Sequence, residues 1–258
     1  MQRAIAENQR GAQLYARGEY DAAAAHYRRA LQAAEAIEDE EGIAANLVSL
    51  ARLQHRTGDL AGAAASLERL LSERNLRFAP HLVAEAALRR ALLAVESADL
   101  ALAERWASHA QQACAEPCGL RAKLLGVRAY LAIARAQADE AGRLAAEAAA
   151  LAQSGADREE RANALRLLGA AALLRGDPAR ALAPLEEALA MDKELALPRA
   201  IANDLVAIGR AHAALGDVAR ARAHFERASA VASADGNLAV QDQARRALES
   251  LAPREPAQ

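Results

Sequence analysis

Two cysteines and one histidine are the residues whose types and spacing come nearest to a chemical site. Cys114 and Cys118 are the only cysteines in the chain, and His109 lies shortly before them. Cysteines separated by three residues across a tight turn can form a disulfide where the compartment is oxidising. With His109 they would supply three metal ligands, but the spacing matches no zinc motif. We favour plain thiols, expect no metal site, and keep the disulfide as the second interpretation.

The other residues that could act in catalysis form no known motif. The six histidines are scattered, and His81 and Glu85 are the only His/Glu pair at helical spacing. We interpret this pair as a surface hydrogen bond. The sequence contains no glycine-rich nucleotide loop, no P-loop, and no His-Glu-x-x-His or Gly-x-Ser-x-Gly motif. We therefore predict a protein without catalytic residues, enzymatic activity or a cofactor.

The composition indicates which elements hold these side chains. Hydrophobic residues make up 53% of the chain and aromatic residues only 3%, so the apolar content is mostly Ala and Leu. Ala, Leu, Arg and Glu are strong helix formers, because they lose little rotamer freedom in a helix. Valine and isoleucine are few and scattered, so no strand is predicted. The composition therefore predicts an all-α fold.

Charge and hydropathy exclude two classes of partner. With 32 basic and 34 acidic residues, the formal net charge is −2, which favours neither nucleic acid nor a membrane surface. No apolar run reaches the roughly 18–20 residues that span a bilayer. Residues 1–10 are polar and lack the apolar core of a signal peptide. The sequence as written predicts a cytoplasmic protein, although a periplasmic protein whose export signal had been removed would look the same.

One pattern recurs along almost the whole chain. An alanine is followed four residues later by an aromatic or aliphatic residue and three residues after that by a small or aliphatic one. The leading alanines are Ala23, Ala63, Ala103, Ala141, Ala181 and Ala221. Their successive spacings are 40, 40, 38, 40 and 40 residues. A fixed spacing of this kind is the signature of a repeat protein with six structural units.

The residues around each leading alanine predict a hairpin of two helices. A glycine that can end the first helix lies five residues earlier in four units: Gly18, Gly58, Gly176 and Gly216. An aspartate that can cap the second helix follows in three of them: Asp59, Asp177 and Asp217. In the third unit, Ala98 and Asp99 hold these two places. The fourth unit has no glycine in its turn, so its register is less well defined than the others.

The first helix of most units carries a small residue at a matching place. These residues are Gly11, Ala51, Ala91, Gly169 and Gly209. A small side chain there lets the two helices of a hairpin touch. Because each hairpin leaves apolar faces that only its neighbours can cover, stacked hairpins bury a continuous core.

These residues resemble the tetratricopeptide repeat. The resemblance rests on Gly11…Gly18-x-Tyr20-x2-Ala23-x3-Tyr27-x2-Ala30 and on Leu168-Gly169…Gly176-Asp177…Ala181-x3-Leu185-x2-Ala188. It rests equally on Ile208-Gly209…Gly216-Asp217…Ala221-x3-Phe225-x2-Ala228. The spacing of 40 exceeds the usual 34, which implies longer helices similar to those in bacterial sensor-regulators and eukaryotic adaptor proteins.

The resemblance implies an all-α, right-handed superhelical solenoid of about six hairpins and a C-terminal capping helix. We expect residues 1–252 to form this one solenoid and residues 253–258 a disordered tail. The expected repeats are residues 4–37, 40–75, 80–115, 118–153, 157–192 and 196–234, with the capping helix at 238–252.

In this family the first helices line a concave groove that binds other proteins. We name the matching positions of this chain the first-helix stripe. Its members are Asn8, Ala12, Tyr15, Val48, Arg52, His55, Glu85, Leu88, Leu92, Arg128, Arg135, Asn163, Arg166, Leu173, Asn203, Val206 and Arg210. Arginine and asparagine dominate its polar members, and guanidinium groups bind carboxylates in bidentate fashion.

The stripe predicts a groove for a protein or peptide, in particular an acidic one or one that presents a C-terminal carboxylate. The predicted contacts are Asn8, Arg52, His55, Arg128, Arg135, Arg166, Asn203 and Arg210. In the alternative interpretation, these arginines pair with acidic residues of neighbouring helices. The residue set by which some family members clamp chaperone tails is not reproduced here.

The sequence leaves three functions open. We favour a non-enzymatic scaffold that binds a protein or peptide. The first alternative is the sensor or regulatory module of a bacterial signalling system. The second is an envelope assembly factor without its export signal, which a Cys114–Cys118 disulfide would favour. The sequence does not indicate the partner's identity or the oligomeric state.

Overall fold

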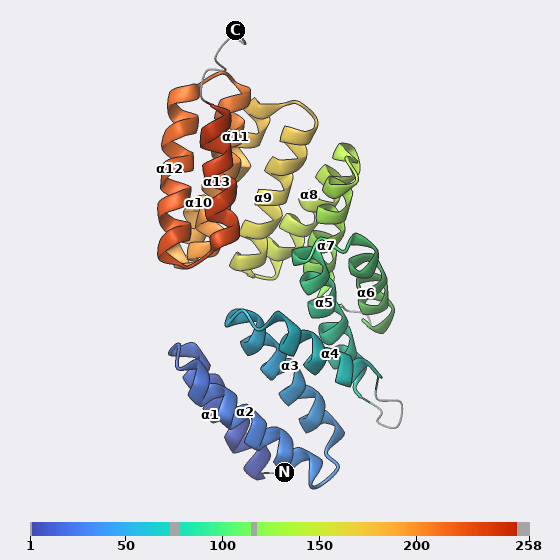
Figure 1. Ribbon diagram of the computed structural model, residues 1–258. Helices are drawn as coiled ribbons and strands as arrows, with labels where there is room; N and C mark the ends of the chain where they lie inside the picture. The colour runs from blue at the N-terminus through green and yellow to red at the C-terminus, as the bar shows by residue number, and fades with distance from the viewer. Residues whose placement is uncertain (1, 73–77, 115–117, 252–258) are drawn as a thin grey trace. The chain divides into compact units, whose positions relative to one another are not determined.

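The protein is all-α. The computed structural model describes residues 2–72, 78–114 and 118–251, and within these ranges it contains thirteen helices and no strand (Figure 1). The helices are α1 (Gln2–Ala16), α2 (Tyr20–Glu35), α3 (Glu40–Arg56), α4 (Leu60–Ser72), α5 (Pro80–Glu96), α6 (Leu100–Ala113), α7 (Arg121–Ala134), α8 (Ala138–Ser154), α9 (Arg158–Leu174), α10 (Pro178–Glu194), α11 (Pro198–Ala214), α12 (Val218–Ala234) and α13 (Leu238–Ser250). The first twelve form the six predicted hairpins, and α13 is the predicted capping helix. The predicted tail at 253–258 lies outside the described residues.

Contacts between residues divide the chain into two compact units. Unit 1 comprises Met1–Leu120 and holds α1–α6, and unit 2 comprises Arg121–Gln258 and holds α7–α13. Within each unit, every helix contacts the next one along the chain. The first helices of neighbouring hairpins also contact one another, α1 with α3 and α3 with α5 in unit 1, and α7 with α9 and α9 with α11 in unit 2. That residues 1–252 form one continuous solenoid stays a prediction.

The turns between paired helices have the predicted chemistry. The four predicted glycines all adopt positive φ angles, from 78° at Gly18 to 83° at Gly58. The carboxylate of Asp59 accepts a hydrogen bond from the backbone N–H of Gly62 at 2.8 Å, and Asp99, Asp177 and Asp217 cap their helices in the same way. Ala98 occupies the glycine position of the third turn with a φ of 58°.

The small residues of the first helices allow close approach within the hairpin, as predicted. A Cβ atom added to Gly11 would lie 2.8 Å from the ring of Tyr27, and one added to Gly209 would lie 2.5 Å from the ring of Phe225. Neither distance is compatible with a normal contact, because the facing atoms belong to buried aromatic rings. These two glycines therefore let a large ring from the second helix pack directly on the backbone of the first.

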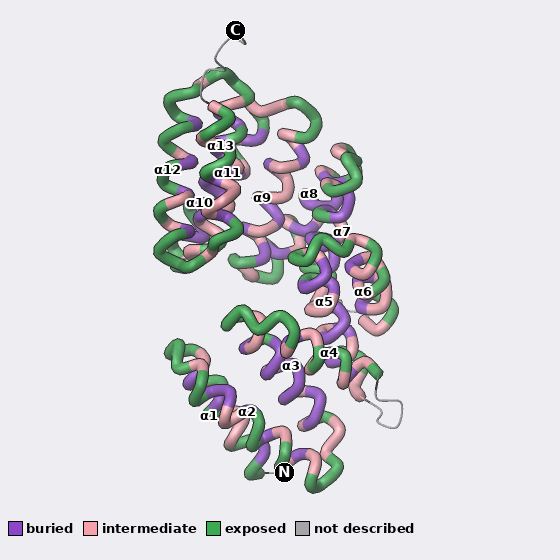
Figure 2. Tube along the Cα trace, in the orientation of Figure 1, coloured by how far each residue is buried: buried purple, intermediate pink, exposed green. Residues whose placement is uncertain are grey.

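Each unit has a core of its own. In unit 1, Tyr27, Leu67 and Leu70 are the largest fully buried side chains, and in unit 2, Leu205 and Phe225 belong to the largest buried cluster. Alanine fills most of the remaining buried positions. Neighbouring helices therefore pack close together and do not surround a deep interior. Figure 2 shows the exposed residues concentrated in the turns and on the outer faces of the helices. No helix in the described part of the chain is long and apolar enough to cross a membrane.

Candidate functional site

The first-helix stripe is the candidate site, and in each unit it runs across first helices that touch. Its half-buried members form bridges between neighbouring first helices. In unit 1, the Asn8 side-chain amide donates to Asn46 Oδ1 at 2.8 Å. In unit 2, Arg166 Nε donates to Asp204 Oδ1 at 2.5 Å. Both bridges join residues 38 positions apart, so they occupy the same place in two different repeats.

Arg166 makes further ion pairs inside unit 2. Its Nη2 donates to Asp192 on α10, and its Nη1 donates to Asn163 Oδ1 at 3.3 Å. Asp192 is 1% exposed and Asp204 is fully buried, so the guanidinium is the counter-ion of two buried carboxylates. These are the interactions that the alternative interpretation expects for the stripe arginines.

The Asp204 carboxylate is harder to ionise in the folded protein than in water. Burial raises the pKa of Asp204 to about 7, although the charge of Arg166 acts in the opposite direction. Asp204 Oδ2 is buried and has no hydrogen-bond partner among the described residues, and the Asp192 carboxylate also acts to raise the pKa of Asp204. A proton on Oδ2 would let Asp204 donate to Asp192 and would relieve the repulsion between the two acids.

The stripe in unit 1 also contains the exposed Arg52 and the half-buried His55. The Arg52 guanidinium lies 4.8 Å from the centre of the Tyr15 ring, in a cation–π arrangement. His55 Nε2 lies 2.8 Å from Glu96 Oε1. No described residue accepts a hydrogen bond from Arg52, so its N–H groups face solvent. The structure thus brings Tyr15 and Arg52 together across α1 and α3.

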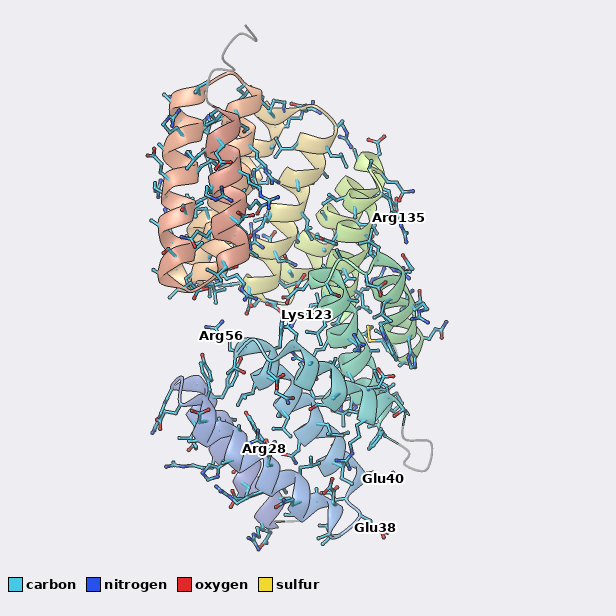
Figure 3. The ribbon with its side chains drawn as sticks, viewed as in Figure 1. Arg28, Glu38, Glu40, Arg56, Lys123 and Arg135 are labelled. Atoms are coloured by element: carbon cyan, nitrogen blue, oxygen red, sulfur yellow. A yellow bond between two sulfur atoms is a disulfide. The ribbon has the colours of Figure 1, made fainter. Side chains whose placement is uncertain are left out.

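The stripe in unit 2 is less uniform than predicted. Arg210 is exposed and Arg128 is half-buried, and neither forms a hydrogen bond or ion pair with any described residue. Asn203 is half-buried on α11. Arg135 follows the last residue of α7 and is exposed in the turn, where Figure 3 labels it, so it does not lie on the helix itself.

A cavity of about 670 Å³ opens beside Arg210. Its walls come from α11, α12 and α13, with the Phe225 ring among them. The cavity lies entirely within unit 2.

The cysteines and histidines singled out in the sequence have specific partners. Cys114 and Cys118 are joined in a disulfide with their Cα atoms 5.4 Å apart, visible as the yellow bond in Figure 3, so the favoured expectation of plain thiols is wrong. His109 stacks against Trp106 at 5.5 Å between ring centres. The predicted hydrogen bond between His81 and Glu85 is wrong, because Glu85 instead accepts two hydrogen bonds from Arg89, one turn later on α5. Within the described ranges, no group of three His, Cys, Asp or Glu side chains could hold a metal ion.

Two buried polar groups of unit 2 were not singled out from the sequence. Burial raises the pKa of Glu160 to about 7. Its carboxylate packs closely on Gly126, because a Cβ atom added to that glycine would lie 2.9 Å from Glu160 Oε1. His212 stacks on His224 at 5.4 Å, and burial lowers the pKa of His224. Acids and histidines at apolar positions of the repeat were the signal that could have identified these groups.

Comparisons with known proteins support the fold. No protein-family model and no curated protein matches the sequence. Among solved structures, a Rap protein complexed with Competence and Sporulation Factor has a TM-score of 0.71 at 19% identity, covering 96% of this chain and 69% of that one. A tetratricopeptide repeat protein from Parabacteroides merdae has a TM-score of 0.57 at 17% identity, covering 97% and 99%.

A third similar structure belongs to a signalling protein. It is a Signal Transduction ATPase with Numerous Domains from Pyrococcus horikoshii that carries a tetratricopeptide repeat sensor, with a TM-score of 0.62 at 15% identity. The match covers 88% of this chain and 34% of that protein. The chain therefore has the fold of tetratricopeptide repeat proteins, an all-α array of helical hairpins.

Proposed function

We propose that this protein is a non-enzymatic scaffold whose first-helix stripe binds an acidic protein segment or peptide. The observation that carries the proposal is the matching pair of arginines on α3 and α11. Arg52 follows Ala51 and Arg210 follows Gly209, the small residues at equivalent places of repeats two and six. Both arginines are exposed, and neither has an acceptor among the described residues. A guanidinium left without a partner at a recurring position of the first helices is available to a carboxylate ligand.

The surroundings of Arg52 suit this role. The Tyr15 ring beneath the guanidinium holds its plane in place without using its N–H donors. Ordering the side chain in advance lowers the entropic cost of binding. Arg166 is left out of the proposed contacts, because Asp192 and Asp204 already occupy its donors.

The similar structures are compatible with this class of ligand. The Rap protein of the first comparison is complexed with Competence and Sporulation Factor. At 19% identity this likeness concerns the fold, so the acidic character of the ligand rests on Arg52, Arg210 and Arg128 alone.

The test compares binding of two pools of fluorescent short peptides with free C-termini, one rich in Asp and Glu and one rich in Lys. We expect the acidic pool to raise fluorescence anisotropy and the double variant Arg52→Ala/Arg210→Ala to weaken this binding by about ten-fold or more. Arg105→Ala/Arg222→Ala is the matched control, because both are exposed arginines of second helices. Equal binding by the two double variants, or no preference for the acidic pool, would contradict the proposal.

A regulatory module is the second candidate. It is favoured by the likeness to the tetratricopeptide repeat sensor of the Pyrococcus horikoshii protein, which is a larger chain. In that case the acidic ligand would be a signal, and binding would change the spacing of the hairpins. Small-angle scattering of the protein with and without a bound peptide from the acidic pool would detect such a change, whereas a simple scaffold would keep the same radius of gyration.

A further inference from the structure

The cavity between α11, α12 and α13 is open to solvent, and its volume is comparable to that of a small-ligand site. Its volume of about 670 Å³ lies within the roughly 300–1,000 Å³ typical of such sites. Ala213, Ala239 and Ala247 supply its accessible apolar surface, and Gln243 supplies a neutral hydrogen-bonding group. Phe225 and Val240 border the cavity but are themselves buried. An amphipathic ligand with an apolar body and a polar head would contact both kinds of surface.

The charges at the cavity do not cancel. Asp242 Oδ2 lies 2.8 Å from Arg246 Nε, and the other oxygen of Asp242 accepts from Arg245. Hydrogen bonding to Arg245 and the nearby arginine charges lower the pKa of Asp242, so this carboxylate stays ionised and paired. Arg210 has no such partner among the residues that the structure describes. One positive charge at the cavity wall is therefore uncompensated.

The surroundings of Arg210 differ from those of its counterpart in unit 1. Arg52 lies over the Tyr15 ring, whereas Arg210 borders an open cavity that includes the Phe225 ring. That ring can lie there because Gly209, the neighbour of Arg210, has no side chain to block it. The same contact that closes the hairpin thus places the buried Phe225 ring next to the cavity that Arg210 borders.

We propose that this cavity binds an apolar monocarboxylate, with Arg210 as the main donor to the carboxylate. A single negative charge matches the single uncompensated positive charge, whereas a phosphate dianion would bring one charge too many. A neutral or cationic ligand would leave Arg210 without a partner. The carboxylate belongs either to a free organic acid or to the last residue of a peptide, and only the peptide form rests on the proposed function.

Isothermal titration calorimetry on the full chain tests the proposal with two matched pairs of probes. The first pair is 4-methylpentanoate and 4-methylpentanamide, which differ only in the charged head. The second is a short neutral peptide ending in leucine, with a free carboxylate or a C-terminal amide. We expect at least one carboxylate probe to bind, and its amide to bind about ten-fold more weakly or worse. Binding of the free acid alone identifies an organic acid as the ligand, and binding of the peptide alone identifies a peptide terminus.

Two variants assign the binding to Arg210. Arg210→Ala should weaken binding of the carboxylate probe by about ten-fold or more. Arg210→Lys, which keeps the positive charge, should weaken it less. Arg222→Ala, an exposed arginine on α12 outside the cavity, should bind as the unaltered protein does. Failure of both carboxylate probes to bind at millimolar concentration, equal binding of acid and amide, or unchanged binding by Arg210→Ala would overturn the proposal.

The outcome is distinguishable from failure of the proposed function. If the carboxylate probes fail while the acidic peptide pool still binds in an Arg52-dependent way, the cavity is not a carboxylate site but the stripe is still a binding surface. If the carboxylate probes bind and the acidic pool does not, the cavity is a carboxylate site and the proposed function is wrong.

Discussion

Arg166 and Arg210 are both arginines of first helices, and the structure surrounds them differently. Arg166 is held by two buried carboxylates from α10 and α11, whereas Arg210 faces solvent beside a cavity. A buried charge that loses its partner is costly, because the remaining charge stays out of water. An exposed side chain without a partner contributes little to folding. The same substitution should therefore lower stability strongly at Arg166 and hardly at all at Arg210.

Arg166→Ala is expected to destabilise unit 2 by roughly 3–5 kcal/mol, as is typical when one partner of a buried ion pair is removed. Arg210→Ala should change the free energy of unfolding by no more than about 0.5 kcal/mol. Urea unfolding followed by circular dichroism measures both. Equal stability of the two variants would mean that the Arg166 ion pairs are not formed in solution.

Because of Asp204, the free energy of unfolding should depend on pH between about pH 4 and about pH 7. Its pKa in the folded protein is raised to about 7 from a usual value near 3.8, so the folded state keeps a proton that the unfolded state releases. The free energy of unfolding should therefore decrease as the pH rises from about 4 to about 7. Asp204→Asn, which mimics the protonated acid toward Arg166 and Asp192, should remove this contribution.

The difference in the free energy of unfolding between the wild type and Asp204→Asn separates the contribution of Asp204 from those of the other titrating groups. Glu160 has a raised pKa and acts in the same direction, whereas the lowered pKa of His224 makes stability fall as the pH drops below about 6.5. Urea unfolding at several pH values should give a wild-type curve that falls more steeply toward neutral pH than the variant curve. Parallel curves would show that Asp204 is ionised in the folded protein throughout this range.

At the scale of the helices, the hairpins depend on how closely two backbones approach. Repeats one and six combine glycine with an aromatic residue, Gly11 with Tyr27 and Gly209 with Phe225. Repeat two has an alanine in place of the glycine and a leucine in place of the aromatic residue, namely Ala51 and Leu67. Repeat five pairs Gly169 with Leu185, so glycine accepts either kind of partner, whereas an alanine facing an aromatic ring should not be accommodated.

Gly209→Ala tests this dependence. Alanine is the better helix former by about 1 kcal/mol, yet its Cβ would lie 2.5 Å from the Phe225 ring, so we expect net destabilisation of about 1–3 kcal/mol. The double variant Gly209→Ala/Phe225→Leu reproduces the pair of repeat two. Gly209→Ala should therefore cost less stability in the Phe225→Leu background than in the wild-type protein. A double-mutant cycle by thermal unfolding measures the coupling. Additive effects would show that residue 209 and the ring do not touch.

The sequence predicted these elements well because their signals are local. The glycine at the end of one helix and the aspartate that caps the next stand within two residues of each other, so Gly58-Asp59 is readable without any tertiary information. The partners of Arg166 could not be read in this way. Asp192 lies on another helix and Asp204 lies 38 residues away, and stripe positions alone do not indicate whether an arginine has a buried acceptor. The choice between free thiols and a disulfide likewise required the positions of the two cysteines, whose Cα atoms lie 5.4 Å apart.

At the scale of the whole chain, unit 2 has what an independent array needs. It contains three hairpins, its own buried clusters, and α13, whose Val240 and Ala244 belong to the core that also holds Phe225. A repeat array generally needs about three repeats and a terminal cap to be stable and soluble. Unit 2 meets both conditions among its described residues.

We therefore expect a fragment of residues 121–258 to fold when it is produced alone. It should show a helical circular dichroism spectrum and a cooperative thermal transition. Removing α13 from the fragment should expose the face that Val240 and Ala244 cover and cause aggregation, detectable by light scattering. A fragment that is unfolded with α13 present, or monomeric and equally stable without it, would contradict this view of unit 2.

The two bridges between first helices restrict how the gene for this protein can change by recombination. Asn8 meets Asn46 and Arg166 meets Asp204 at one and the same repeat position, but the first pair is neutral and the second is charged. A crossover between misaligned repeats that placed repeat five before repeat two would set Arg166 against Asn46, so a neutral amide would replace one of its two carboxylate partners. A join of repeat one to repeat six would set Asn8 against Asp204 and leave this buried acid without its counter-ion. The bridges would select against both products.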